Sequence, residues 1–167
     1  MTKLHRKTLQ ELRIMATKQG IEQLKEDEGF RKNPYRCTAG KLTIGYGYNM
    51  EANPQKLHSR QLTEMKVSGI SQEFAEQLLL AEVKDVENEL HSRLVFWSKL
   101  SPTRKDVLIN MGYNLGVPGL MKFKNTLQTL YQEKYRETAE HMLDSLWARQ
   151  VPARAKRLAN QMRLGEY

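Results

Sequence analysis

The chain has 167 residues, enough for one domain or two closely joined lobes, and its 27 Lys and Arg against 19 Asp and Glu give a formal charge of +8 at pH 7. Hydrophobic residues make up 40% and charged residues 28%, which is typical of a folded soluble protein and excludes a disordered one. No apolar run approaches the roughly 18 residues of a membrane span, and residues 1–18 contain no apolar signal-peptide core. Cys37 is the only cysteine in the sequence, which excludes an intrachain disulfide and a multi-cysteine zinc site.

The positive charge gathers near both ends of the chain. Residues 1–18 contain five Lys or Arg and one acid, and residues 149–163 contain five and no acid. The isoelectric point near 9.6 indicates an affinity for polyanions, which include nucleic acid, anionic wall polymers and anionic membrane surfaces. Two solvated basic helix faces are the simpler interpretation of the same pattern.

The first predicted elements are helical and lead into a small sheet. Apolar residues at helical spacing predict a basic amphipathic extension over residues 1–19, which Gly20 is expected to end. Residues 21–27 form a second short helix in this prediction, and Gly29 stops it. Between residues 30 and 53, glycines and prolines alternate with Leu, Thr, Ile and Tyr, which predicts short strands joined by turns. Residues 49–70 are expected to form a loop and a short helix.

The second half of the chain is predicted to be entirely helical. Ser71 offers a cap for a long amphipathic helix from residue 72 to about 93, which would extend about 30 Å. Further helices are expected at 102–114, at about 124–132 with a cap, at 136–148 and at 152–162. The sequence therefore predicts an α+β, mostly α fold. Its parts are a small α+β lobe over 20–70, a connecting helix over 71–96 and a helical lobe over 97–167.

One segment combines residues suited to a hydrolytic reaction. Glu28 stands at the end of a predicted helix, Cys37 follows nine positions later in a turn, and Thr43 lies six positions further on a strand flanked by Gly45 and Gly47. A helix end, a turn and a strand can converge on one cleft wall. An acid beside a polar group that orients water is what glycoside cleavage requires. Taken singly, each residue also has an ordinary structural role, as a solvated acid, a small buried side chain or a strand former.

These residues resemble the phage lysozymes of glycoside hydrolase family 24. That family's pattern is Glu, eight residues, Asp or Cys, five residues, Thr, and then Ile-Gly-x-Gly, which residues 28–47 match without a gap. Residues 109–116 resemble the family's segment at the bottom of the cleft. Residues 147–157 (WARQVPARAKR) resemble its C-terminal signature, so the likeness covers roughly residues 20–165.

The resemblance implies a two-lobed lysozyme fold and the activity of a peptidoglycan N-acetylmuramidase without metal or cofactor. Such an enzyme hydrolyses the β-1,4 bond from N-acetylmuramic acid to N-acetylglucosamine. By this resemblance Glu28 is the general acid, Arg154 pairs with it, and Cys37 and Thr43 hold the attacking water on the opposite face of the ring, which predicts inversion. Gly45 and Gly47 support the site. The resemblance also implies a group of residues in contact with substrate: Asn49, Tyr113, Asn114, Thr126 and His141.

Two positions depart from or qualify the family pattern. Many members have His where this chain has Tyr48, so an ion pair made by that His is absent here. Cys37 replaces an Asp that would be ionised at pH 7, whereas a thiol is mostly neutral. Either Arg36 and Lys41 depress its pKa, or the thiol only orients water together with Thr43. Direct attack of a thiolate on the sugar is a third option and requires retaining geometry.

The implied role is that of a monomeric phage endolysin. It would wait in the host cytoplasm for a holin to open the inner membrane, act on the wall in the periplasm and lyse the host cell. The basic extension is expected either to pack on the protein or to contact anionic membrane or lipopolysaccharide, and no specific nucleic acid partner is expected. A virion-associated tail lysozyme and a lytic transglycosylase are the alternatives for the same domain. A non-catalytic binding protein is the rival from another class.

Overall fold

The computed structural model describes residues 15–167, whose contacts form two compact units. One unit contains residues 22–85, and the other contains residues 15–21 together with residues 86–167. Helices α1 (Lys18–Glu28) and α3 (Gln72–Arg93) each contribute to both units. The division thus falls inside α3, whereas the sequence analysis assigned residues 71–96 to a separate connecting segment.

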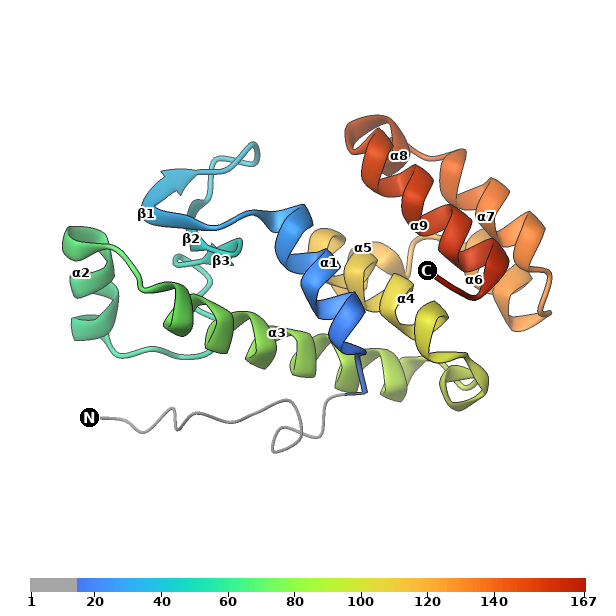
Figure 1. Ribbon diagram of the computed structural model, residues 1–167, viewed down its shortest axis with the longest axis horizontal. Coiled ribbons are helices and arrows are strands. Elements are labelled where there is room, and N and C mark those ends of the chain that lie inside the picture. Colours follow the sequence, from blue (N-terminus) through green and yellow to red (C-terminus); the bar gives the residue numbers. More distant parts are fainter. Residues whose placement is uncertain (1–14) are drawn as a thin grey trace. The chain divides into compact units, whose positions relative to one another are not determined.

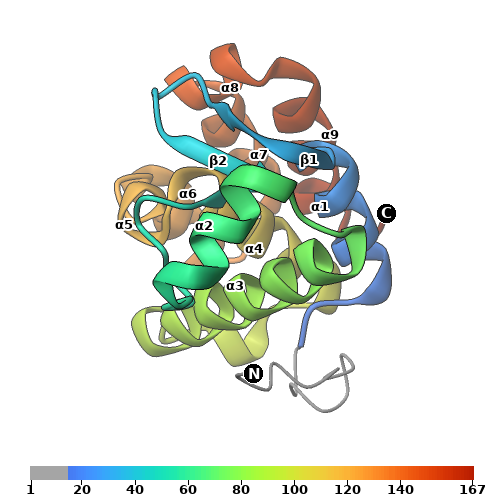
Figure 2. The same ribbon diagram turned by 90° about the vertical axis from the view of Figure 1, so that its left-hand side faces the viewer.

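The unit of residues 22–85 contains the sheet. Strands β1 (Arg31–Arg36), β2 (Leu42–Gly45) and β3 (Tyr48–Asn49) form an antiparallel sheet in the order β1-β2-β3. Helix α2 (Ser59–Ser68) packs against β1, and the two lie side by side in both views (Figures 1 and 2). The side chains of Ile44, Tyr46 and Tyr48 are buried. Strand β2 approaches α3 so closely that a Cβ added at Gly45 would lie 3.0 Å from the Cβ of Ala75.

The second unit is built from helices. After a short 3-10 helix (Trp97–Lys99) come α4 (Pro102–Leu115), α5 (Val117–Leu120), α6 (Lys124–Tyr131), α7 (Tyr135–Leu143), α8 (Leu146–Gln150) and α9 (Pro152–Leu164). Helix α7 packs against both α6 and α9, and α9 also contacts α4 and α8 (Figure 1). The largest fully buried side chains here are Leu90, Leu108, Met111, Leu120, Leu130, Met142 and Leu158. This architecture confirms the predicted α+β, mostly α fold.

Several predicted elements are present, and some of their limits differ. The long helix occupies residues 72–93 as expected, and the Ser71 hydroxyl accepts a hydrogen bond from Phe74 N–H at 3.1 Å. The single helix predicted over 136–148 is wrong, because Ser145 Oγ accepts from Ala148 N–H at 3.1 Å and starts a new helix. The cap predicted for the helix near residue 124 is also wrong. Phe123 stands at that position and offers no side-chain acceptor.

The prediction that Gly20 separates two helices is wrong, because Gly20 lies in the first turn of α1. Thr17 stands before this helix, and its Oγ1 accepts a hydrogen bond from Gly20 N–H at 3.0 Å. Residues 15–17 are not helical, so the predicted extension helix does not continue through them. The rest of that predicted extension, over residues 1–14, lies outside the described residues.

Two buried carboxylates hold the chain just before α1. Glu87 Oε1 accepts hydrogen bonds from Met15 N–H at 2.7 Å and from Ala16 N–H at 2.9 Å. Asp106 accepts from Thr17 N–H at 3.0 Å, from the Thr17 hydroxyl and from the Tyr167 hydroxyl. Burial raises the pKa of Asp106, although its hydrogen bonds with Thr17 and Tyr167 act in the opposite direction. Three consecutive residues are therefore tied to α3 and α4.

Candidate active site

Glu28 is the last residue of α1, and its side chain is half-buried. Gly29 follows with φ at 67°, a left-handed conformation that an L side chain rarely adopts, and its N–H donates to the Lys25 carbonyl at 2.9 Å. The glycine ends the helix there and lets the chain turn directly into β1. The local sequence thus places a carboxyl group where the helix meets the sheet.

The hairpin between β1 and β2 positions Cys37. Cys37 N–H donates to the Lys41 carbonyl at 3.0 Å, and Gly40 N–H donates to the Cys37 carbonyl at 2.8 Å, which closes a tight turn. The side chain of Cys37 is partly exposed, whereas Thr43 on β2 is only 4% exposed. The Thr43 hydroxyl donates to the Lys41 carbonyl at 2.9 Å, which is the carbonyl that also accepts from Cys37 N–H, and the Thr43 side chain contributes to the lowered pKa of the Cys37 thiol. The structure therefore brings these two predicted residues together.

The hairpin backbone lowers the pKa of the Cys37 thiol. The largest contribution is a hydrogen bond from the Lys41 backbone, which burial opposes, and the Ala39 backbone and the Thr43 side chain add to the lowering. Backbone N–H groups aimed at the sulfur favour its anionic form. The predicted influence of the Arg36 and Lys41 charges is therefore not the cause. The Arg36 guanidinium instead pairs with the Glu51 carboxylate at 2.8 Å.

Strand register adds Asn49 to the same face of the sheet. Thr43 pairs directly with Asn49 on β3, and directly paired residues of antiparallel strands project to one face. The Asn49 side chain is half-buried, and its Oδ1 accepts hydrogen bonds at 3.0 Å from the N–H groups of Glu51 and Ala52. Asn49 therefore also shapes the turn after β3.

Gly45 and Gly47 adopt backbone conformations that the chain needs at the end of β2 and before β3. Their φ angles are 65° and 79°, both in the left-handed region. Tyr48, which replaces the family's His, is buried, and its hydroxyl donates to Asn53 Oδ1 at 2.7 Å. Burial raises the pKa of Tyr48 to about 12. A hydrogen bond between two uncharged side chains therefore takes the place of the ion pair that the family's His makes.

Tyr35 is a residue of this region that sequence reasoning missed. It lies on β1 and pairs directly with Thr43, and the Arg31 guanidinium carbon sits 4.3 Å from the centre of its ring. Burial raises the pKa of Tyr35, the Arg31 charge lowers it, and the charges of Glu28 and Cys37 raise it further. The phenol is thus within electrostatic reach of both predicted catalytic groups. The available signal was the strand period of two, which places residues 35 and 37 on one face.

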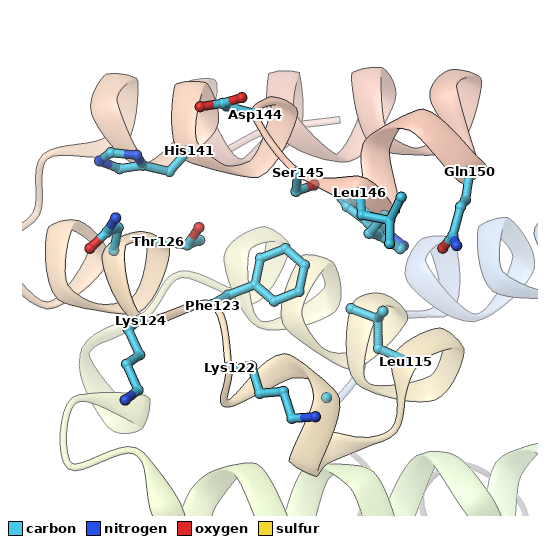
Figure 3. Close-up of a pocket in the computed structure, with 13 residues that line it drawn as sticks. Leu115, Lys122, Phe123, Lys124, Thr126, His141, Asp144, Ser145, Leu146 and Gln150 are labelled. Carbon is cyan, nitrogen blue, oxygen red and sulfur yellow. The ribbon is translucent and has the colours of Figure 1, made fainter.

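The helical unit contains a pocket of about 470 Å³ that includes two further predicted residues. Thr126 from α6 and His141 from α7 both line it, and Figure 3 shows them beside Phe123 and below Asp144. Trp147 forms another part of the lining, and its Nε1–H donates to Asn114 Oδ1 at 2.8 Å. Asn114 is thus attached to the pocket wall.

Tyr113 and Arg154 occupy other parts of the helical unit. Tyr113 is half-buried on α4 and does not line the pocket with Thr126 and His141. Arg154 on α9 is 8% exposed, and its Nε–H donates to Asn110 Oδ1 at 2.8 Å. Asn110 therefore orients the guanidinium within this unit. The ion pair between Arg154 and Glu28 stays a prediction.

Two further properties concern metal sites and membrane spans. Across residues 15–167, no three His, Cys, Asp or Glu side chains are grouped so that they could bind a metal ion. The helices formed by these residues are also too short or too polar to cross a membrane.

Comparison with known proteins gives a consistent set of relatives. A model of the phage lysozyme family matches residues 25–162. "Probable T4-type lysozyme 2" of Dictyostelium discoideum is 28% identical over 86% of this chain and 93% of its own length. "Pre-baseplate central spike protein Gp5" of Enterobacteria phage T4 is 29% identical over 82% of this chain, which corresponds to 26% of the spike protein. "Endolysin" of Acyrthosiphon pisum secondary endosymbiont phage 1 is 26% identical over 60% of each chain.

Proposed function

This chain belongs to the phage lysozyme family, and we propose that it cleaves peptidoglycan with Glu28 as general acid and with Cys37 and Thr43 as holders of the attacking water. As a lysozyme it is a glycoside hydrolase that acts on peptidoglycan. The proposed bond is the β-1,4 linkage between N-acetylmuramic acid and N-acetylglucosamine. The observation that carries the proposal is that Cys37 and Thr43 both donate a hydrogen bond to the Lys41 carbonyl, on the hairpin that follows Glu28.

The reaction transfers one proton to the leaving group and one water to the sugar. Glu28 protonates the glycosidic oxygen as its bond to the anomeric carbon breaks, and water attacks that carbon from the opposite face. Thr43 and Cys37 orient the water, whose proton leaves to the sulfur or to solvent. Attack from the opposite face inverts the configuration. The first step requires Glu28 in its protonated form.

The sugar-binding proposal includes residues from both units. Asn49 lies on the sheet face that carries Thr43, and Thr126 and His141 line the helical pocket. Side chains with both donors and acceptors suit sugar hydroxyls and acetamido groups. Tyr113 and Asn114 complete the proposed set, and Arg154, oriented by Asn110, is proposed to position Glu28.

Digestion of purified peptidoglycan tests the chemistry. We expect wild-type protein to release reducing-end muropeptides whose new end first appears as the α-anomer, as inversion of a β bond requires. The Glu28→Gln variant should be slower by about 10²- to 10⁴-fold, because it cannot donate the proton. Glu26→Gln is the matched control, since Glu26 is an exposed acid two residues earlier on the same helix.

Each alternative chemistry has its own product. Anhydro-muropeptides, which are lighter by one water, would contradict hydrolysis and assign a lytic transglycosylase. A first-formed β-anomer would contradict inversion and support attack by the Cys37 thiolate. Absence of products from wild-type protein would contradict the enzymatic assignment of this chain.

The proposed biological role is lysis of the host cell by a free endolysin. In this proposal the enzyme is made in the host cytoplasm and reaches the periplasm when a holin opens the inner membrane. The similarity to a phage endolysin supports it, while the similarity to a baseplate spike protein supports a virion-associated lysozyme as the second candidate. Quantitative mass spectrometry of purified virions separates the two. A virion-associated lysozyme should be found at the copy number of a structural protein. A free endolysin should not reach that copy number.

A further inference from the structure

Tyr35 shares one face of the sheet with the proposed water-holding residues. It pairs directly with Thr43, and Thr43 pairs directly with Asn49, so the three side chains form one row across the strands. Cys37 lies two residues after Tyr35, and its N–H donates to the Lys41 carbonyl across the hairpin. Because side chains two residues apart on an extended chain point to the same face, Cys37 is expected on the face that carries Tyr35. Tyr35 thus stands in the row that already carries the proposed chemistry.

The phenol of Tyr35 lies near Glu28 as well. The charges of Glu28 and Cys37 both raise its pKa in addition to the larger effect of burial, so the hydroxyl keeps its proton at neutral pH. These three groups belong to residues 22–85, which form one compact unit. A protonated hydroxyl is therefore held within electrostatic reach of both the acid and the water-holding sulfur.

The ring of Tyr35 is fixed, while its hydroxyl remains available. The Arg31 guanidinium stacks on the ring with its carbon 4.3 Å from the centroid, and the side chain of Tyr35 is half-buried. Within residues 15–167, the Tyr35 hydroxyl takes part in no hydrogen bond of the structure. The hydroxyls of Tyr46 and Tyr48 in the same unit, by contrast, have protein partners at 3.1 Å and 2.7 Å.

We propose that the Tyr35 hydroxyl binds the sugar at the cleavage point and holds it between Glu28 and the Cys37–Thr43 pair. A phenol offers one donor and one acceptor, which suits a sugar hydroxyl or an acetamido group. The packed ring lets the hydroxyl orient the sugar at little entropic cost. This inference rests on the proposed function, because it assigns Tyr35 to the substrate of that reaction.

Kinetics of the Tyr35→Phe variant on solubilised glycan strands test the proposal. We expect kcat/KM to fall by about 3- to 10-fold, because one neutral hydrogen bond to the substrate is lost. The matched control is Tyr46→Phe, which removes a buried hydroxyl of the same unit that already has a protein partner in Gln72. The control should keep the wild-type kcat/KM, and both variants should keep the melting temperature within a few degrees.

A binding measurement separates contact with the sugar from an effect on the sheet. In a Glu28→Gln background, NMR titration with tri-N-acetylglucosamine should give a Kd about 3- to 10-fold higher when Tyr35 is replaced by Phe. Unchanged kcat/KM and Kd in an active enzyme would overturn the role of Tyr35 alone. A wild-type protein that releases no muropeptides would overturn the proposed function and this inference together.

Discussion

Cys37 is the residue whose chemistry departs most from an Asp at the same position. Its pKa is lowered by the Lys41 backbone first, and by the Ala39 backbone and the Thr43 side chain to a smaller degree. The hairpin therefore favours the negative charge that an Asp at this position would carry. A sulfur whose anionic form is favoured in this way is suited to orient water and to accept its proton.

Replacement of Thr43 by Ala should raise the pKa of Cys37. The variant removes a side chain that favours the thiolate, while the backbone contributions remain, so the pKa of Cys37 should be higher than in the wild type. The rate of iodoacetamide alkylation as a function of pH reports this titration, because only the thiolate reacts. The midpoint should move to higher pH in Thr43→Ala.

Thr38→Ala is the matched control for that titration. Thr38 is an exposed residue of the same hairpin turn and contributes nothing to the pKa of Cys37. Equal alkylation midpoints in all three proteins would contradict a contribution of Thr43 to the pKa of Cys37.

The start of α1 shows how a distant contact changes the behaviour of a helix. In an exposed helix, Gly to Ala stabilises by about 1 kcal/mol. A Cβ added at Gly20 would lie 2.5 Å from Asp106 Cγ, which is shorter than real contacts allow. Gly20→Ala should therefore lower the free energy of unfolding by about 1–3 kcal/mol, as measured by chemical denaturation.

A double-mutant cycle assigns this loss to its cause. In an Asp106→Ala background the clash is absent, so the same Gly20→Ala change should be neutral or should stabilise by about 1 kcal/mol. An equal loss in both backgrounds would contradict steric conflict with the carboxylate and would indicate a property of α1 alone.

At the element scale, the prediction succeeded where local pattern decides. The long apolar period and the Ser71 cap identified α3, and the alternation of Gly, Pro and strand formers identified the sheet region. It failed at Gly20 and Ser145 for different reasons. Gly20 is accommodated by a cap and by packing against Asp106, whereas Ser145 restarts a helix within an unbroken apolar period.

The charge of the whole molecule is unevenly distributed. Residues 22–85 carry 9 Lys and Arg and 10 Asp and Glu, while residues 15–21 with 86–167 carry 14 and 8. Residues 1–14 add 4 basic residues and 1 acid. The proposed acid and water holders thus lie in a nearly neutral unit, and the net positive charge belongs to the rest of the chain.

Removal of residues 2–14 should weaken binding to vesicles of phosphatidylglycerol and phosphatidylethanolamine. Each basic residue near an anionic surface contributes about 1 kcal/mol, so the loss of four should weaken binding by about tenfold or more at low salt. Salt screens the attraction, so the loss should be smaller at high salt. The deletion stops before Met15, because Glu87 holds Met15 and Ala16. Vesicle sedimentation measures the binding.

A variant without the four basic side chains provides the control for that deletion. Replacement of residues 3, 6, 7 and 13 by Gln keeps the chain length and should weaken vesicle binding by a similar factor. Muropeptide release from purified peptidoglycan should be unaffected by either change. Unaltered vesicle binding in both variants would contradict the expected membrane contact and favour the alternative that the extension packs on the protein.

The sequence by itself determined the fold class, the family resemblance and the spacing of Glu28, Cys37 and Thr43, because each follows from local pattern along the chain. Only the tertiary structure decided that Tyr35 faces the same row as Thr43, that Asn110 orients Arg154 and that backbone groups lower the pKa of Cys37. These properties depend on strand register and on contacts between distant residues. Periodicity shows which face of an element is buried, but it does not show which partner covers that face.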